Sequence, residues 1–162
     1  MKFDAVHGRW QRLQWVLLVV FLCLPELALL GFFATGAVLS ASASMPRPAD
    51  AVVVLGGDVS LGGRYARGRD LVLAGYGQRL ILLFPSAEQV RDAHARLPGV
   101  EVVQSTPDTG SWGEAEAVRQ RMLAQGLRSV IVVSDPPHML RLRYTWGSIL
   151  RGTGLDYTLV AT

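Results

Sequence analysis

The stretch AVVVLGGDVSLGGRYARGRD, residues 51–70, decides the fold of this chain. It opens with a continuous run of apolar residues, passes through two pairs of glycines and continues into a helical segment. A strand that is apolar at successive positions is buried on both faces, as in a parallel sheet covered by helices. The stretch therefore predicts a first strand, a glycine-rich turn and a first crossover helix.

The rest of the chain repeats this alternation. Apolar, β-rich runs follow at residues 80–84, 100–103, 130–134 and 157–161, and helical stretches are expected at 64–74, 87–97, 113–125 and 137–150. Right-handed crossovers between parallel strands place helices on both faces of a sheet. The expected fold class is α/β, a Rossmann-like three-layer parallel sheet of about five strands, preceded by one N-terminal transmembrane helix. In such sheets a ligand binds outside the carboxyl ends of the strands.

Residues 15–39 form an almost continuously apolar run that is interrupted by Pro25 and Glu26. A helix of this length, at 1.5 Å per residue, is long enough to cross a hydrocarbon core of about 30 Å. Proline is tolerated in a spanning helix, and the cost of one glutamate is outweighed by the flanking leucines and phenylalanines. The run is predicted to be a single-pass signal anchor in contact with the lipid of the cytoplasmic (inner) membrane.

The charges before this run set its expected orientation. The basic residues are Lys2, Arg9 and Arg12, against the single acid Asp4. The positive-inside rule then places the N-terminus in the cytoplasm and the folded domain outside it. The expected parts are a cytoplasmic segment 1–14, the transmembrane helix 15–39, a linker 40–48 that packs little, and the α/β domain 49–162.

Three other interpretations of the apolar run remain open. It could be a signal peptide cleaved near Ala41-Ser42-Ala43, which would also leave the domain outside the cytoplasm. It could form two short helices hinged at Pro25, which would return the domain to the cytoplasm. It could also be a buried helix of the core.

Composition excludes several classes of site. The formal net charge is +3, and all but one of the 16 basic residues are arginines, which bind phosphate and carboxylate in a bidentate way. The single cysteine, Cys23, excludes an intrachain disulfide and a cysteine zinc site. The histidines are scattered at His7, His94 and His138. No metal and no cofactor are therefore expected, and no nucleic acid, because the arginines do not form a stripe with interleaved aromatic residues.

The glycine-rich loop LGGDVSLGGR contributes Gly56, Gly57, Asp58 and Arg64 to the candidate site. Glycines let backbone N–H groups approach a ligand closely, and the next helix N-terminus favours an anion. The loop is neither GxGxxG nor a P-loop, which disfavours NAD and ATP; its alternative role is a tight turn. Arg64 opposes the helix macrodipole at this terminus, which suggests an anionic partner.

Two further motifs follow the later strands. Ser111 and Glu114 have the spacing of a capping box, so helix initiation is the alternative to a role for Glu114 as acid or base. In SDPPHMLR, Ser134 or Asp135 is expected to cap a helix on which His138 and Arg141 share one face. A neutral histidine there could accept a proton or contact phosphate, although a lone histidine is more often structural.

The ordered pieces carry a family resemblance. They are DAVVVLGG at 50–57, Arg64 with Leu71 and Gly75, Glu114, and VVSDPPHMLR at 132–141. In this order they resemble the YdcF/SanA/ElyC-like family, a bacterial domain of unknown function. The resemblance implies an α/β fold, frequent membrane anchoring and a link to cell-envelope biogenesis, without a settled reaction.

Two positions depart from the family pattern. FPSAE, residues 84–88, stands where the family has Ser-Gly-Gly after the second strand. SWGEA, residues 111–115, replaces Asn-Thr-x-Glu-Asn, of which only Glu114 remains. The loss of two amide side chains leaves a weakened site as an open alternative.

Together these features predict a membrane-anchored, extracytoplasmic protein that binds an anionic small molecule, phosphate-bearing or nucleotide-like, or a lipid-linked envelope precursor. The candidate ligand-binding residues are Gly56, Gly57, Asp58, Arg64, Ser111, Ser134 and Arg141, and the candidate catalytic residues are Glu114 and His138. Whether the protein is an enzyme is left open. The alternative is a non-catalytic binding or scaffold protein of the envelope with a degenerate site.

Overall fold

The computed structural model describes residues 3–58, 60–106, 108 and 110–162, and it describes side chains from residue 14 onward. The chain divides into two compact units, one ending at Ala37 and the other spanning Val38–Thr162. Each unit is described by itself.

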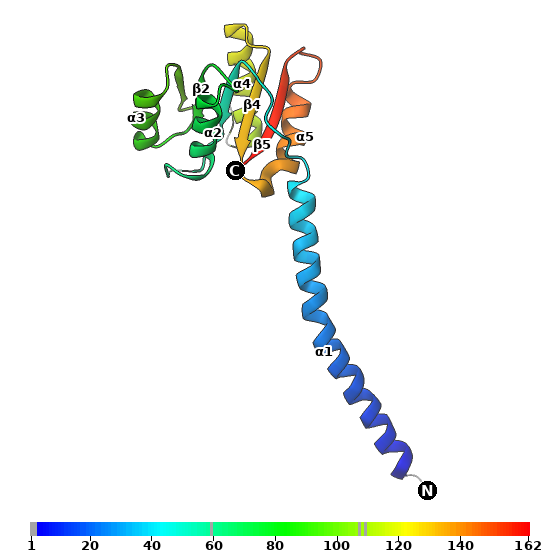
Figure 1. Ribbon diagram of the computed structural model, residues 1–162. Helices are drawn as coiled ribbons and strands as arrows, with labels where there is room; N and C mark the ends of the chain where they lie inside the picture. Colours follow the sequence, from blue (N-terminus) through cyan, green and yellow to red (C-terminus); the bar gives the residue numbers. More distant parts are fainter. Residues whose placement is uncertain (1–2, 59, 107, 109) are drawn as a thin grey trace. The chain divides into compact units, whose positions relative to one another are not determined.

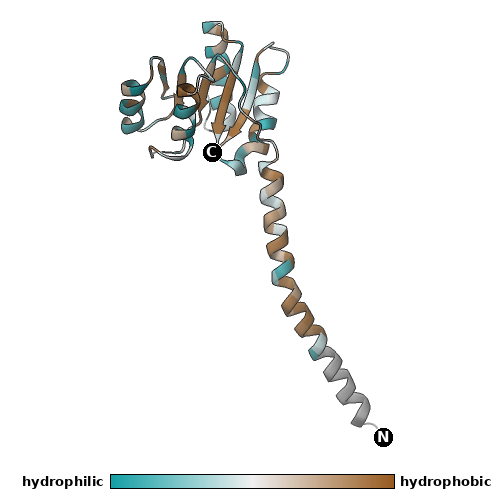
Figure 2. Ribbon diagram, viewed as in Figure 1, coloured by the Kyte–Doolittle hydropathy of each residue, from teal (hydrophilic) through white to brown (hydrophobic). Residues whose placement is uncertain are grey.

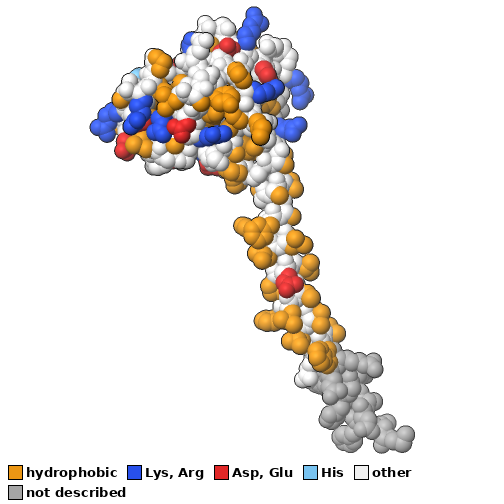
Figure 3. All heavy atoms as spheres, in the orientation of Figure 1, with side chains coloured by type: hydrophobic (Ala, Val, Ile, Leu, Met, Phe, Trp, Pro, Cys, Tyr) orange, Lys and Arg blue, Asp and Glu red, His pale blue; other side chains and the backbone are white. Residues whose placement is uncertain are grey.

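The first unit consists of helix α1 (Phe3–Ser40), whose last three residues belong to the second unit. A turn follows at residue 41. Its segment Gln14–Ser40 has 27 residues and a mean hydropathy of 2.6, so it is long and apolar enough to cross a membrane. Figure 2 shows this segment as mainly hydrophobic, and Figure 3 shows its hydrophobic side chains exposed along the helix. Pro25 lies inside the helix without ending it.

The second unit contains one five-stranded parallel sheet in the order β3-β2-β1-β4-β5 (Figure 1). The strands are β1 (Ala51–Val54), β2 (Leu80–Leu83), β3 (Val100–Val103), β4 (Ser129–Ser134) and β5 (Asp156–Ala161). In the central strand Val53 pairs with Ile81 on one side and with Val132 on the other. The expected α/β class and parallel sheet are confirmed.

Helices connect the strands, and most lie within two residues of the expected bounds. They are α2 (Gly63–Leu73), α3 (Ala87–Arg96), α4 (Ser111–Gln125), the short 3₁₀ helix η1 (Pro136–His138) and α5 (Met139–Ile149). The expected single helix over 137–150 is therefore split, because its first turn, which carries the two prolines, is 3₁₀ rather than α.

The core has two halves, one on each face of the sheet. Because successive strand residues point to opposite faces, Ala51, Val53 and Leu55 pack with residues of α4 and α5. Val52 and Val54 pack instead with residues of α2 and α3. All four residues of β1 are buried, which explains why its sequence is apolar without alternation.

The segment 40–48 packs more closely than its composition indicates. The backbone N–H of Ser44 donates to the carbonyl of Leu159 in β5 at 2.7 Å, and Arg47 donates to the Thr158 hydroxyl at 3.3 Å. Ser42 is buried. This segment was expected to be a linker that packs little; it is held against the edge strand, and the compact unit begins at Val38 rather than at residue 49.

Candidate functional site

The candidate site lies at the carboxyl ends of β1 and β4, the two strands between which the chain order reverses. In open α/β sheets this switch point is where a crevice forms. A cavity of about 430 Å³ opens here. It is lined by Leu55, Gly56, Gly57, Arg64, Phe84, Gly110, Ser111, Glu114, Ser134, His138, Arg141 and Leu142. Of the residues singled out in the sequence, all but Asp58 line this one cavity.

The turn after β1 leaves no room for side chains. A Cβ atom on Gly56 would lie 3.0 Å from the Phe84 ring and 3.3 Å from Oε1 of Glu114. Gly57 has φ of +96°, a conformation that glycine adopts without strain. Its Cβ position is 3.5 Å from Nη1 of Arg64. The glycine pair therefore brings the backbone close to the cationic side of the cavity.

Arg64 is buried at the start of α2 and is held on two sides. Its Nη1 donates to the carbonyl of Gly56, and its Nη2 pairs with Oδ2 of Asp135 at 2.5 Å. The anionic partner expected for Arg64 is thus, within the chain itself, the carboxylate of Asp135. The Nε–H of Arg64 is buried and has no hydrogen-bond partner among the described residues.

Asp58 lies outside the cavity lining and organises the loop instead. Its Oδ2 accepts the backbone N–H of Arg64 at 3.0 Å, and its Oδ1 accepts both the backbone N–H and the hydroxyl of Ser60. Burial raises the pKa of Asp58, but these hydrogen bonds outweigh it and hold the pKa below the usual value. Asp58 therefore caps α2 in place of Gly62, whose position offers no side chain.

The capping box expected at Ser111 and Glu114 is absent, and this prediction is wrong. Gly110 occupies the N-cap position and Ser111 is already the first residue of α4. Glu114 instead accepts the backbone N–H of Gly56 through Oε1 at 3.0 Å. Burial raises the pKa of Glu114, and the Gly56 N–H together with Arg64 and Arg141 opposes this rise. Glu114 therefore ties α4 to the glycine turn.

His138 and Arg141 follow β4 and both line the cavity. Asp135, one of the two residues expected to cap this helix, occupies the N-cap position of η1. Its carboxylate accepts a hydrogen bond from Arg64 and makes none to the helix. Burial and the nearby Arg141 and Arg64 lower the pKa of His138, while Asp135 opposes this. These effects favour the neutral form of His138. Arg141 is exposed, and its guanidinium makes no hydrogen bond or ion pair with the described residues.

Sequence reasoning missed two residues of the site. Asp135 was considered only as a helix cap, and nothing local shows that its carboxylate meets Arg64, which is 71 positions away. Phe84 lines the cavity with φ of +51°, unusual for a bulky residue. Its place as the last residue of the second apolar run was the available signal, because that position lies at the carboxyl edge of the sheet.

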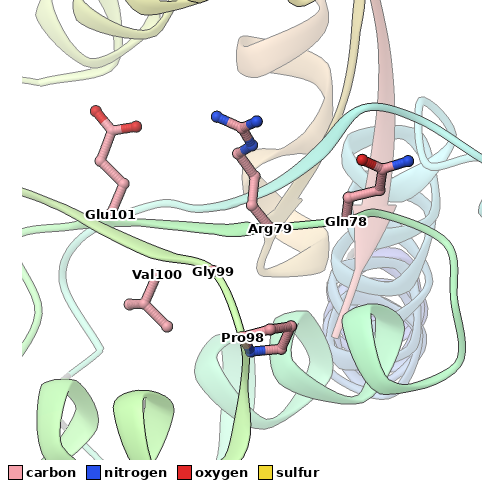
Figure 4. A pocket seen from close by; sticks show the side chains of 6 residues that line it. All are labelled: Gln78, Arg79, Pro98, Gly99, Val100 and Glu101. Atoms are coloured by element: carbon pink, nitrogen blue, oxygen red, sulfur yellow. The ribbon is translucent and has the colours of Figure 1, made fainter.

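A second hollow, of about 380 Å³, lies at the amino ends of β2 and β3. In Figure 4 Gln78, Arg79 and Glu101 extend to one side of the backbone, and Pro98 and Val100 to the other. Arg79 donates to Gln125 at 2.7 Å, and Glu101 accepts from Arg121 at 2.8 Å. Its charged groups are thus already paired, and none of the candidate residues lines it.

Comparison of the chain with protein-family models, with curated proteins and with solved structures found no match.

Proposed function

We propose that this chain is a membrane-anchored, extracytoplasmic protein of the YdcF-like kind that binds an anionic ligand, phosphate-bearing or nucleotide-like, in cell-envelope biogenesis. The observation that supports it most is the cavity at the switch point, where Arg64, His138 and Arg141 meet the glycine turn. The class of ligand follows from these donors, since arginine and backbone N–H groups bind phosphate oxygens well. The role in the envelope comes from the family resemblance.

The charge balance of the cavity favours Arg141 as the main anion contact. Arg64 is already neutralised by Asp135, and Glu114 adds a carboxylate whose raised pKa reflects the cost of burying its charge. Arg141 is the lining cation that makes no hydrogen bond or ion pair with the described residues, although its charge acts on Glu114 and His138. If the protein is an enzyme, neutral His138 or Glu114 transfers the proton, and Arg141 stabilises negative charge.

A scaffold protein with a degenerate site is the second candidate. The observation that favours it is the internal pairing of Arg64 with Asp135 and the carbonyl of Gly56, which gives this arginine a structural role. The two missing amide side chains in SWGEA point the same way. This candidate predicts a folded domain that binds no anion.

Titration calorimetry of the full chain in detergent micelles separates the two candidates, with inorganic pyrophosphate, a nucleoside diphosphate and the uncharged nucleoside as probes. We expect binding of at least one of the two anions and none of the nucleoside. Arg141→Ala should raise the Kd roughly tenfold, the effect of losing one charge-assisted hydrogen bond. Arg91→Ala is the control, because it removes an exposed arginine of α3 that lies outside the cavity.

Two results would contradict the proposed binding function. One is a folded wild-type protein that binds neither anion, which supports the scaffold. The other is equal affinity in Arg141→Ala, Arg91→Ala and the wild type, which removes this cavity as the site.

A further inference from the structure

A separate cleft lies where the segment after α1 meets the edge of the domain. Its volume is about 230 Å³, and its polar lining includes Ser42, Arg47, Arg143, Tyr157 and Thr158. In Figure 1 the connection from α1 to β1 runs beside β5 and α5, which supply the rest of this lining. All residues that line the cleft belong to the second unit. Leu159 is the aliphatic residue in this lining.

When α1 crosses a bilayer, the length of its apolar segment places the cleft that follows it at the depth of the lipid headgroups. The 27 residues of Gln14–Ser40 measure about 40 Å at 1.5 Å per residue, close to the thickness of a bilayer with its headgroups, about 40–45 Å. A chain that crosses a bilayer with this helix therefore has Ser40 in the headgroup layer. Ser42 follows two residues later, at most about 7 Å further along the chain.

Hydrogen bonds tie β5 to the segment that follows α1. Ala43 donates to the carbonyl of Ser40 at 3.0 Å, and Ser44 donates to the carbonyl of Leu159 at 2.7 Å. Since β5 is bound to the segment directly after α1, the lining from β5 stays within a few residues of the end of the span.

The side chains of the cleft match a phosphate group. Arg143 is exposed, and its guanidinium has no partner in the described part of the chain. Arg47 reaches the Thr158 hydroxyl at 3.3 Å and the carboxylate of Asp156 only at 4.0 Å, with both charged side chains about two-thirds exposed or more. Two arginines with hydroxyl groups between them supply the donors that a phosphate oxygen needs.

The adjoining groove adds side chains that suit a membrane surface. It shares Arg143 and Tyr157 with the cleft and is also lined by Leu140, Tyr144 and Arg151. Tyr144 is 71% exposed and Leu140 43% exposed. Tyrosine is enriched at the membrane–water interface, where one end of the ring is apolar and the other is wet.

We infer that this cleft binds the phosphate of an anionic phospholipid headgroup, through Arg47 and Arg143, and so holds the domain against the bilayer. The inference rests on the membrane anchoring in the proposed function, but not on the ligand cavity or on which side of the membrane the domain lies. The two arginines outnumber the one nearby carboxylate, Asp156, so the cleft attracts negative charge.

The test uses the full chain in nanodiscs made of equal parts phosphatidylcholine and phosphatidylglycerol. Native mass spectrometry of the released protein counts the lipids of each kind that remain bound. We expect phosphatidylglycerol to be retained in excess by the wild type. Arg143→Ala should lower that excess roughly fivefold to tenfold, and Arg47→Ala should lower it in the same direction. Arg143→Lys keeps the charge but not the bidentate geometry. Its excess of phosphatidylglycerol should lie between that of the wild type and that of Arg143→Ala.

The control is Arg91→Ala, which removes an exposed arginine on α3. It should retain lipid as the wild type does, and unchanged melting temperatures confirm that all variants fold. The inference is overturned if the wild type enters the discs but shows no preference for phosphatidylglycerol, or if Arg143→Ala matches Arg91→Ala. A chain that does not enter the discs overturns the membrane anchor as well.

Discussion

Arg64 shows how one buried side chain joins the fold and the site. Its guanidinium links the turn after β1, through Gly56, to the residue after β4, Asp135. A buried charge needs such partners, because leaving it unpaired in a low-dielectric environment is strongly unfavourable. The remaining Nε–H is buried without a partner among the described residues, at the edge of the cavity. The residue thus shapes the site, and Arg141 is left as its available cation.

Glu114 makes the stability of the domain depend on pH in a defined direction. Burial raises its pKa in the folded state, so the folded chain binds more protons than the unfolded chain between the two pKa values. The stability from this group is present below the unfolded pKa and is lost as pH rises through the folded pKa. Glu114→Gln keeps an oxygen to accept the Gly56 N–H but does not titrate.

We therefore expect Glu114→Gln to gain stability relative to the wild type as pH rises from about 4 to about 7. Urea denaturation of both proteins across this range measures the difference. Groups such as Asp50 and Asp58, whose pKa values are lowered, titrate in both proteins and cancel in the comparison. Parallel stability curves for the two proteins would show that the Glu114 carboxyl is not perturbed.

At the scale of elements, the contact of α2 with β1 depends on a single glycine. A Cβ atom on Gly68 would lie 2.2 Å from Cγ2 of Val54, and Val54 is buried in the sheet. The helix therefore approaches the strand more closely than any other residue at position 68 would allow. This close approach sets the position of Arg64, one turn earlier on the same helix.

Gly68→Ala should destabilise the domain although alanine favours helix. Overpacking of a core costs about 1–3 kcal/mol, while the better helix propensity of alanine returns up to about 1 kcal/mol. Urea denaturation followed by near-UV circular dichroism measures the net loss. In a Val54→Ala background the clashing methyl group is gone, so the same change should cost less or become favourable. Equal costs in both backgrounds would contradict this packing.

At the scale of the whole molecule, the charges that precede the apolar segment of α1 predict which side of the membrane carries the domain. Lys2, Arg9 and Arg12 precede the span and only Asp4 opposes them. A reporter enzyme that is active only outside the cytoplasm, fused after Thr162, should be active. A fluorescent protein that matures only in the cytoplasm should be dark at the same position. The reverse pattern would overturn the proposed orientation.

Sequence alone was sufficient for the elements and for the grouping of most candidate residues around one cavity. The apolar runs predicted the parallel sheet because strands buried on both faces need apolar residues at every position. Parallel order then brings the turns after β1 and β4 to one edge, which is why Gly56, Arg64, Ser134 and His138 could be grouped without coordinates. The apolar run before them predicted a helix long enough to cross a membrane.

Only the tertiary structure decided which partner each polar side chain takes. Ser111 and Glu114 satisfy the local rule for a capping box, yet Glu114 bonds to Gly56, which is 58 positions away. Arg64 meets Asp135 and Ser44 meets Leu159 in the same way. Hydrogen bonds of this kind depend on the distances between elements after packing, whereas hydrophobic periodicity depends on each segment by itself. The elements were therefore readable from the sequence, and the contacts between them were not.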